Sequence, residues 1–218
     1  MKKNLNEKKQ RAAAIVAALA EQYPLAECTL SYEDAWQLMV AVRLAAQCTD
    51  ARVDMVTPVL FAEFPTPRAL ADAPYERVHE IVKPCGLGAT KARDIQASMK
   101  KLCDEYHGNM PDDIDTLLTF PGVGRKSANL IVGDVFGKPA IVCDTHCIRI
   151  CGLLGLTDSK NPNVVEKQLR AVIEPQAGND FCHRLVLHGR ACCVARRPDC
   201  KNCCLNALCS YAAAQQNA

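Results

Sequence analysis

The chain has 218 residues, a length that accommodates one large domain or two small ones. Apolar residues make up 49% of the sequence and charged residues 23%, which is ordinary for a globular protein with a real core. The formal net charge of +2 is weak for a nucleic-acid-binding protein, so charge by itself does not indicate such a partner. No run approaches the ~20 apolar residues of a membrane span, which excludes a membrane protein.

The N-terminal segment places basic residues ahead of a short apolar run at 12–20, an order that a secretory signal peptide shares. This run consists mostly of alanine and leads directly into Glu21, so we expect an amphipathic first helix instead. The chain has 14 cysteines, most of them within helical patterns, as expected for buried free thiols in a reducing compartment. We therefore expect a cytoplasmic protein.

Helical periodicity continues along most of the chain. Ser31 and Asp34 have the spacing of a capping box ahead of a helix that has Trp36 and Val42 on its apolar face. Helical patterns follow in chain order over 50–60, 74–82, 90–106, 126–136, 148–154, 164–173 and 181–187. No segment shows a sustained two-residue alternation of apolar and polar residues, so the sequence predicts an all-α fold.

Residues 120–126, Phe-Pro-Gly-Val-Gly-Arg-Lys, are the most informative stretch of the chain. Gly122 and Gly124 can adopt a positive φ without steric cost, and the segment predicts a helix, a glycine turn and a second helix. The first N–H groups of a helix lack intrahelical partners and bind phosphate readily. On these residues alone, a helical hairpin that binds no ligand is an equal alternative.

Lys126 lies at the start of the second helix, which puts a potential amine nucleophile beside the anion-binding turn. A lysine in this position is usually a solvated surface charge, but only a neutral amine attacks carbon. We expect partial burial and the positive end of the helix to lower the pKa of Lys126, against the opposite effect of bound phosphates. Asp144 precedes another helical pattern, where it is a natural N-cap.

Four cysteines near the C-terminus form the pattern Cys193-x6-Cys200-x2-Cys203-x5-Cys209. Four thiolates bind either zinc or a [4Fe–4S] cluster, and the single Cys-x2-Cys pair with unequal outer spacing modestly favours iron–sulfur. The register is ambiguous, because Cys192 adjoins the first cysteine. Cys204 likewise adjoins the third.

The glycine turn at 120–126, Val-Cys-Asp-Thr-His at 142–146 and the cysteine pattern together resemble the helix-hairpin-helix DNA glycosylases that carry an iron–sulfur loop. The resemblance runs from about residue 8 to residue 211. It implies a two-domain, all-α fold, with a six-helix domain at 28–138. Residues 1–27 and 139–218 then form a discontinuous domain that holds a [4Fe–4S] cluster.

The resemblance also implies the chemistry. The expected activity is that of a bifunctional base-excision-repair DNA glycosylase and abasic-site lyase, a monomer that acts on double-stranded DNA with damaged pyrimidines or abasic sites. Lys126 would form a Schiff base with the sugar and cleave the strand by β-elimination, and Asp144 would assist proton transfer and stabilise positive charge. The cluster ligands are then Cys193, Cys200, Cys203 and Cys209, with Cys192 and Cys204 as spectators.

The DNA contacts implied by the resemblance come from several segments. Gln47 would fill the hole left by the extruded base, and Leu87 would wedge the opposite strand; the alternatives are a polar helix end and a loop residue folded into the core. His146 is either structural or a phosphate contact. The remaining expected contacts are Gly122, Val123, Gly124 and Arg125 of the hairpin and Arg196 and Arg197 of the cysteine loop. Asp199 stands where further positive charge would be expected, and it either weakens this contact or pairs with an arginine.

Two other functions share these features. A monofunctional glycosylase on the same scaffold generally lacks a lysine at the hairpin position, so Lys126 argues against it. A non-catalytic DNA-binding or redox module would use the hairpin and the cluster without forming a covalent bond to DNA.

Overall fold

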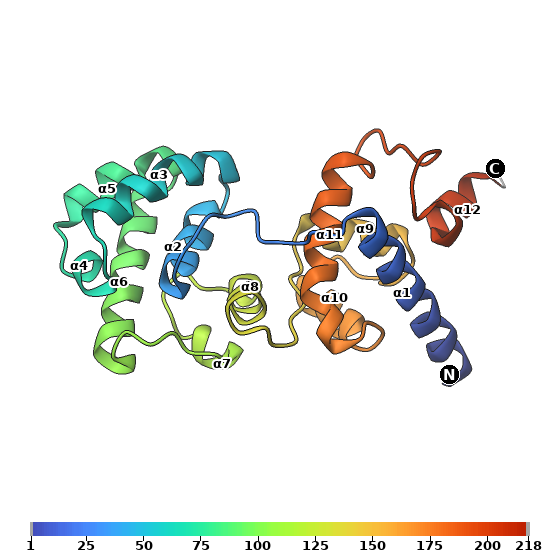
Figure 1. Cartoon of the computed structure of the whole chain (residues 1–218), viewed down its shortest axis with the longest axis horizontal. Helices are drawn as coiled ribbons and strands as arrows, with labels where there is room; N and C mark the ends of the chain where they lie inside the picture. Colours follow the sequence, from blue (N-terminus) through green and yellow to red (C-terminus); the bar gives the residue numbers. More distant parts are fainter. Residues whose placement is uncertain (1, 217–218) are drawn as a thin grey trace. The chain divides into compact units, whose positions relative to one another are not determined.

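The computed structural model describes residues 2–216, and within this range the chain is helical and has no strand. This confirms the all-α prediction (Figure 1). The helices are α1 (Lys2–Gln22), α2 (Ala35–Ala45), α3 (Asp50–Glu63), α4 (Pro67–Ala71), α5 (Tyr75–Val82), η1 (Lys83–Cys85), α6 (Gly88–Tyr106), α7 (Ile114–Leu117), α8 (Arg125–Phe136), α9 (Thr145–Leu153), α10 (Pro162–Arg170), η2 (Pro175–Ala177), α11 (Gly178–Ala191), η3 (Asn206–Leu208) and α12 (Ser210–Gln216), where η denotes a 3-10 helix.

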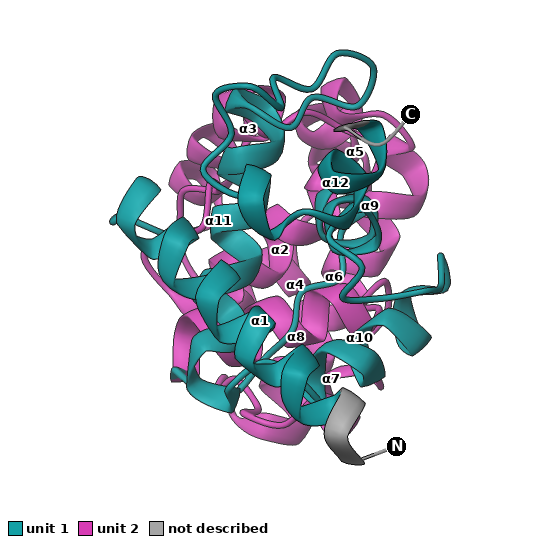
Figure 2. Cartoon of the chain, turned by 90° about the vertical axis from the view of Figure 1, so that its right-hand side faces the viewer, with its two compact units in different colours: residues 1–27, 137–218 teal, residues 28–136 magenta. Residues whose placement is uncertain are grey.

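The chain divides into two compact units (Figure 2). Unit 1 combines residues 1–27 with residues 137–218, and unit 2 is the continuous segment 28–136. The boundary expected from the sequence follows residue 138. Among the described residues, no helix is both long enough and apolar enough to cross a membrane.

The core of unit 2 forms around α6, which packs against α2, α4 and α5. Ile95, Met99 and Leu102 of α6 are buried there, as the amphipathic pattern of the sequence predicts. Helix α2 packs in turn against α3 and α8, and α7 packs against α8. The hairpin helices are therefore attached to the core of this unit.

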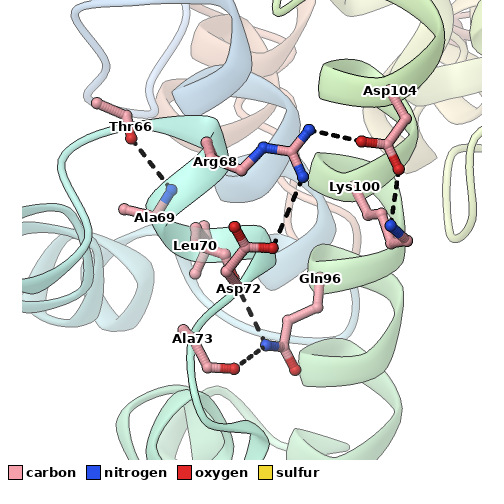
Figure 3. Close-up of polar contacts among 9 residues, drawn as sticks. All are labelled: Thr66, Arg68, Ala69, Leu70, Asp72, Ala73, Gln96, Lys100 and Asp104. Atoms are coloured by element: carbon pink, nitrogen blue, oxygen red, sulfur yellow. Dashed lines mark hydrogen bonds and ion pairs between the residues drawn. The ribbon is translucent and has the colours of Figure 1, made fainter.

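Polar contacts hold the outer face of α4 to α6 (Figure 3). Asp104 accepts hydrogen bonds from Arg68 at 2.5 Å and from Lys100 at 2.7 Å. These side chains are exposed, so each pair contributes about 0–1 kcal/mol to stability. Gln96 of α6 donates to the carbonyl oxygen of Ala73 at 2.7 Å and thereby fixes the connection after α4.

The start of α2 differs from the sequence prediction. The N-cap is Asp34, and the side chain of Gln37 accepts a hydrogen bond from the Asp34 backbone N–H at 3.1 Å. The predicted capping box of Ser31 and Asp34 is therefore wrong by one turn, because the helix begins at Ala35. The box forms instead between Asp34 and Gln37, three residues later.

The core of unit 1 forms where α11 packs against α1 and α9. Cys143, Cys147, Cys151 and Cys182 are all buried in this unit as free thiols. Side-chain hydrogen bonds with Cys143, Cys151 and Cys182, together with burial, hold the pKa of the Cys147 thiol well above its usual value. The four cysteines pack as small apolar groups, as the sequence predicts for most cysteines of the chain.

Candidate functional site

The glycine turn of residues 120–124 connects α7 to α8 in the predicted helix-turn-helix arrangement. Gly122 has a φ of +73°, and the Val123 N–H donates to the carbonyl oxygen of Phe120 at 3.1 Å. The Val123 side chain is buried. The turn thus uses the Val123 N–H internally, and the N–H groups without helical partners belong to the first turn of α8, which starts at Arg125.

The glycine turn packs against an ion pair between α2 and α6. Arg43 donates to Asp94 through Nε at 2.8 Å and through Nη2 at 2.6 Å. A β-carbon at Gly122 would lie 2.5 Å from Arg43 Nε and 2.8 Å from Asp94 Oδ2. Ser98 of α6 donates to the carbonyl oxygen of Pro121 at 2.8 Å. Only glycine satisfies both the positive φ and this close approach.

Arg125 and Lys126 are the first two residues of α8, and both are exposed. The predicted partial burial of Lys126 is therefore wrong, because the helix presents its first turn to solvent. Lys126 lies at the positive end of the α8 dipole. Gly124, just before α8, has open space around its α-carbon.

Asp144 is the N-cap of α9, which confirms that part of the sequence prediction. Its Oδ1 accepts a hydrogen bond from the Cys147 N–H at 2.7 Å, and its φ of −89° is ordinary extended backbone. The cap fixes the carboxylate at the positive end of α9. Asp144 itself is partly exposed.

His146 is half-buried, and its ring occupies the space that a β-carbon at Gly189 of α11 would need. This contact lets α9 approach α11 closely. Of the two roles that the sequence allows for His146, the packing favours the structural one.

Gln47 and Leu87 share an unusual backbone conformation. Gln47 lies between α2 and α3 with a φ of +55°, and Leu87 precedes α6 with a φ of +51°. Both side chains are exposed, Leu87 to 57%. The alternative that Leu87 folds into the core is therefore wrong. Left-handed conformations of bulky residues are rare and cluster at functional sites.

The C-terminal cysteines surround a small cavity of about 30 Å³ in unit 1. Its lining includes all four expected ligands, Cys193, Cys200, Cys203 and Cys209, together with Cys192, His188 and apolar side chains such as Leu153 and Leu205. The four expected ligands are free thiols. Cys204 is outside the set that lines the cavity.

Donors from nearby elements reach these sulfurs. Arg149 of α9 donates to Cys193 Sγ at 3.5 Å, and the Leu205 N–H donates to Cys203 Sγ at 3.4 Å. Burial raises the pKa of the Cys193 thiol, while Arg149 acts in the opposite direction. Four soft donors in an apolar cavity, with hydrogen bonds directed at the sulfurs, fit a four-cysteine metal centre.

Two side chains near this cavity were not assigned as ligands from the sequence. Ligand atoms of His188, Cys192 and Cys203 lie within 4.8 Å of one another. His188 is buried and its Nδ1 is 3.1 Å from the Tyr23 hydroxyl. The sequence signal for His188 is its position in the last turn of α11, four residues before Cys192. Cys192 belongs to the cavity, so its description as a spectator rests on spacing alone.

Arg196 and Arg197 are exposed in the loop between Cys193 and Cys200. Asp199 accepts hydrogen bonds from the Asn202 backbone N–H at 3.3 Å and from its side chain at 2.9 Å. The Asp199 carboxylate therefore caps the turn that leads to Cys203. Of the two expectations for Asp199, pairing with an arginine is replaced by pairing with Asn202.

Comparison with known proteins identifies related sequences over nearly the whole chain. Residues 40–175 match the family model described as "HhH-GPD superfamily base excision DNA repair protein". Endonuclease III of Synechocystis sp. is 41% identical over 208 residues, which cover 95% of each chain. Endonuclease III of Escherichia coli (strain K12) is 36% identical over 203 residues, covering 93% of this chain and 96% of that one.

Solved structures agree with these sequence matches. A trapped endonuclease III–DNA covalent intermediate aligns with a TM-score of 0.89 and 37% identity, covering 95% of this chain and 98% of that chain. A thermostable thymine-DNA glycosylase aligns with a TM-score of 0.84 at 18% identity, over 96% of this chain and 98% of that chain, and shows the shared fold.

The packing beneath the turn predicts different effects for its two glycines. Gly122→Ala forces a β-carbon into the Arg43–Asp94 pair at a positive φ, so we expect a loss of about 1–3 kcal/mol of unfolding free energy. Gly124→Ala meets no neighbouring atom within 4 Å. It should change stability by about 0.5 kcal/mol or less. Urea unfolding of both variants measures the difference, and equal losses would contradict the proposed packing role of Gly122.

Proposed function

The chain belongs to the HhH-GPD superfamily of base-excision DNA repair proteins, and on this premise we propose that it removes oxidised pyrimidines from double-stranded DNA and then cleaves the strand. It is a DNA glycosylase with abasic-site lyase activity, acting as a monomer. The observation that carries the proposal is an exposed lysine amine in the first turn of a helix, because the N-terminal end of a helix suits a DNA phosphate.

Lys126 supplies the nucleophile. Its amine attacks the sugar C1′, and the damaged base departs with the electrons of the C1′–N bond and takes up a proton. The nitrogen then loses a proton, and its lone pair breaks the C1′–O4′ bond, so that O4′ takes up a proton and a protonated Schiff base forms. The iminium makes the C2′ protons acidic, so removal of one of them expels the 3′ phosphate by β-elimination. Only the neutral amine can attack the sugar carbon.

Asp144 supplies the opposite charge. One carboxylate oxygen is held by the Cys147 N–H, which fixes the orientation of the group without neutralising it. A fixed carboxylate stabilises the positive charge that develops on the sugar as the base departs. The second oxygen can accept the proton that the lysine nitrogen loses. Capping and catalysis are therefore compatible functions of one side chain.

Contacts to the DNA backbone come from exposed groups of both units. The hairpin contributes Gly122, Gly124 and the first-turn N–H groups of α8 beside Arg125, with Val123 shaping the turn from its buried side. Arg196 and Arg197 add cationic contacts to phosphates, which release counterions on binding. These contacts set affinity and register rather than the choice of base.

An enzyme that acts on a base inside a duplex must extrude the nucleotide. The exposed side chains of Gln47 and Leu87 are suited to occupy the space that extrusion leaves. Their left-handed backbone projects them from the ends of helices α2 and α6. The strained conformation at both positions supports this role.

We assign a [4Fe–4S] cluster to Cys193, Cys200, Cys203 and Cys209. These four thiolates would hold the cluster, and their bonds to it would cross-link the segment that follows α11 to residues 200–209. The chain's own residues then hold the intervening loop, with its two arginines, through Arg149 and the Asp199–Asn202 contacts. The uneven cysteine spacing favours this group over zinc.

Borohydride reduction tests the covalent step directly. On duplex DNA with a thymine glycol or an abasic site, we expect reduction to capture a protein–DNA adduct, which Lys126→Ala abolishes because no other amine takes its place. Gel electrophoresis measures the adduct. Base release without an adduct would indicate a monofunctional glycosylase, and DNA binding without either product would indicate a non-catalytic module.

Replacement of Asp144 by asparagine separates charge from capping. Asparagine is as good an N-cap as aspartate, so Asp144→Asn should keep α9 and DNA affinity intact. Loss of the negative charge should slow base excision on the order of 100-fold, as is typical for a transition-state electrostatic contact. Single-turnover excision measures this rate, and an unchanged rate would remove Asp144 from the catalytic group.

The cluster assignment predicts contrasting effects for two cysteines. The purified protein should absorb broadly in the violet-to-blue region and contain about four iron atoms per chain. Cys193→Ala should lose most of this absorption, whereas Cys204→Ala should retain it, because Cys204 does not line the cavity. Elemental analysis measures the metal. Stoichiometric zinc would contradict the assignment, and loss of iron in Cys204→Ala would contradict the ligand register.

A further inference from the structure

Lys91 of α6 is a lysine with no exposed surface. Its Nζ donates to the carbonyl oxygen of Leu44 at 2.8 Å and to the carbonyl oxygen of Cys85 at 2.8 Å. Burial lowers the pKa of Lys91, an effect that the neighbouring Cys48 and Cys85 thiols partly offset. Burying an amine is costly unless its hydrogens are bonded, so these two contacts determine where the side chain lies.

Both acceptors are carbonyls at helix ends. Leu44 lies in the last turn of α2, and Cys85 is the last residue of η1. Carbonyls in the last turn of a helix have no partner within it, and a cation there also interacts favourably with the helix dipole. One amine therefore binds carbonyl groups at the C-terminal ends of two helices, α2 and η1.

The chain that follows each carbonyl carries a residue of the proposed DNA interface. Gln47 comes three residues after Leu44, and Leu87 comes two residues after Cys85. These two residues have the left-handed backbone described above. The Lys91 backbone N–H also donates to the Leu87 carbonyl oxygen at 3.0 Å. Lys91 thus binds the segment before Gln47 through the Leu44 carbonyl. It binds the chain at Leu87 through the carbonyl of Cys85 and through that of Leu87 itself.

We propose that Lys91 is a positioning residue for nucleotide extrusion: its buried amine fixes the loops of Gln47 and Leu87 relative to each other, so that both side chains enter the duplex together. This inference rests on the proposed function, because it assigns a support to the two side chains that replace the extruded base. Lys91 itself touches no DNA.

The test uses a DNA that supports extrusion but no chemistry. A duplex with a tetrahydrofuran abasic-site analogue opposite 2-aminopurine reports unstacking of the opposite strand as a rise in fluorescence. Lys91→Met keeps the length of the side chain and removes its donors, leaving two carbonyls unpaired. We expect the fluorescence rise to fall about tenfold, while affinity for the same duplex changes about threefold or less, since the hairpin contacts stay.

Gln96 provides a matched control on the same helix. It too donates to a backbone carbonyl, that of Ala73, but this connection leads from α4 to α5 and carries no residue of the interface (Figure 3). Gln96→Met should lower the melting temperature of the protein and leave the fluorescence rise within about twofold of the unaltered protein.

Two results would overturn the inference. A folded Lys91→Met variant with the full fluorescence rise would show that the loops need no such support. If the fluorescence rise falls equally in Lys91→Met and Gln96→Met, the loss reflects general destabilisation of the protein and not a positioning role of Lys91. If Lys91→Met does not fold, Lys91→Gln, which keeps an amide donor on a shorter side chain, should show an intermediate rise, and a full rise would count against the proposal.

The outcome is separable from that of the proposed function. The fluorescence measurement involves no bond to the sugar, whereas borohydride trapping of the unaltered protein does. Absence of trapping with a retained contrast between Lys91→Met and Gln96→Met would remove the covalent chemistry and leave the positioning role. Trapping without that contrast would leave the covalent chemistry and remove the positioning role of Lys91.

Discussion

Three polar side chains on one stripe of α6 hold the backbone segments on which the proposed site of unit 2 depends. Lys91, Asp94 and Ser98 are spaced by three and four residues, so they lie on one face of the helix. Lys91 bonds the chain before Gln47 and before Leu87, Asp94 orients Arg43 under the glycine turn, and Ser98 bonds Pro121. Ile95, Met99 and Leu102, which are buried on the adjoining stripe of the same helix, build the core.

This arrangement explains how strained backbone persists at exposed positions. A bulky residue in a left-handed conformation costs roughly 1–3 kcal/mol, and Gln47 and Leu87 both adopt it. Hydrogen bonds from a charged donor contribute roughly 1.5–3 kcal/mol each, and Lys91 makes two of them next to these residues. These hydrogen bonds hold the backbone next to both left-handed residues.

Helix α9 has a comparable role in unit 1. Asp144 caps its first turn, and Arg149, one turn further along, reaches Cys193 Sγ. Cys147 and Cys151 of this helix are buried, and its His146 ring packs against Gly189 of α11. The Asp144 carboxylate and the cysteine loop thus both contact the same short helix.

The sequence by itself determined the features that are encoded locally. Helical periodicity gave the all-α class, paired glycines gave the hairpin, and the position of Asp144 gave its cap, because each depends on residues within a few positions of one another. The cysteine spacing likewise marked a metal-binding loop. The capping box at Ser31 was misplaced by one turn, since two polar residues near one helix start satisfy the same local pattern.

Tertiary structure alone decided which polar groups of these helices are buried. The pattern of α6 predicts an apolar face and a solvated one, yet Lys91 lies inside, bonded to Leu44 at a sequence separation of 47 residues, and Arg43 meets Asp94 at a separation of 51. The exposure of Lys126 and the cavity position of His188 and Cys192 were decided in the same way. A buried polar contact is specified by a partner that is distant in the chain, and no local pattern contains that partner.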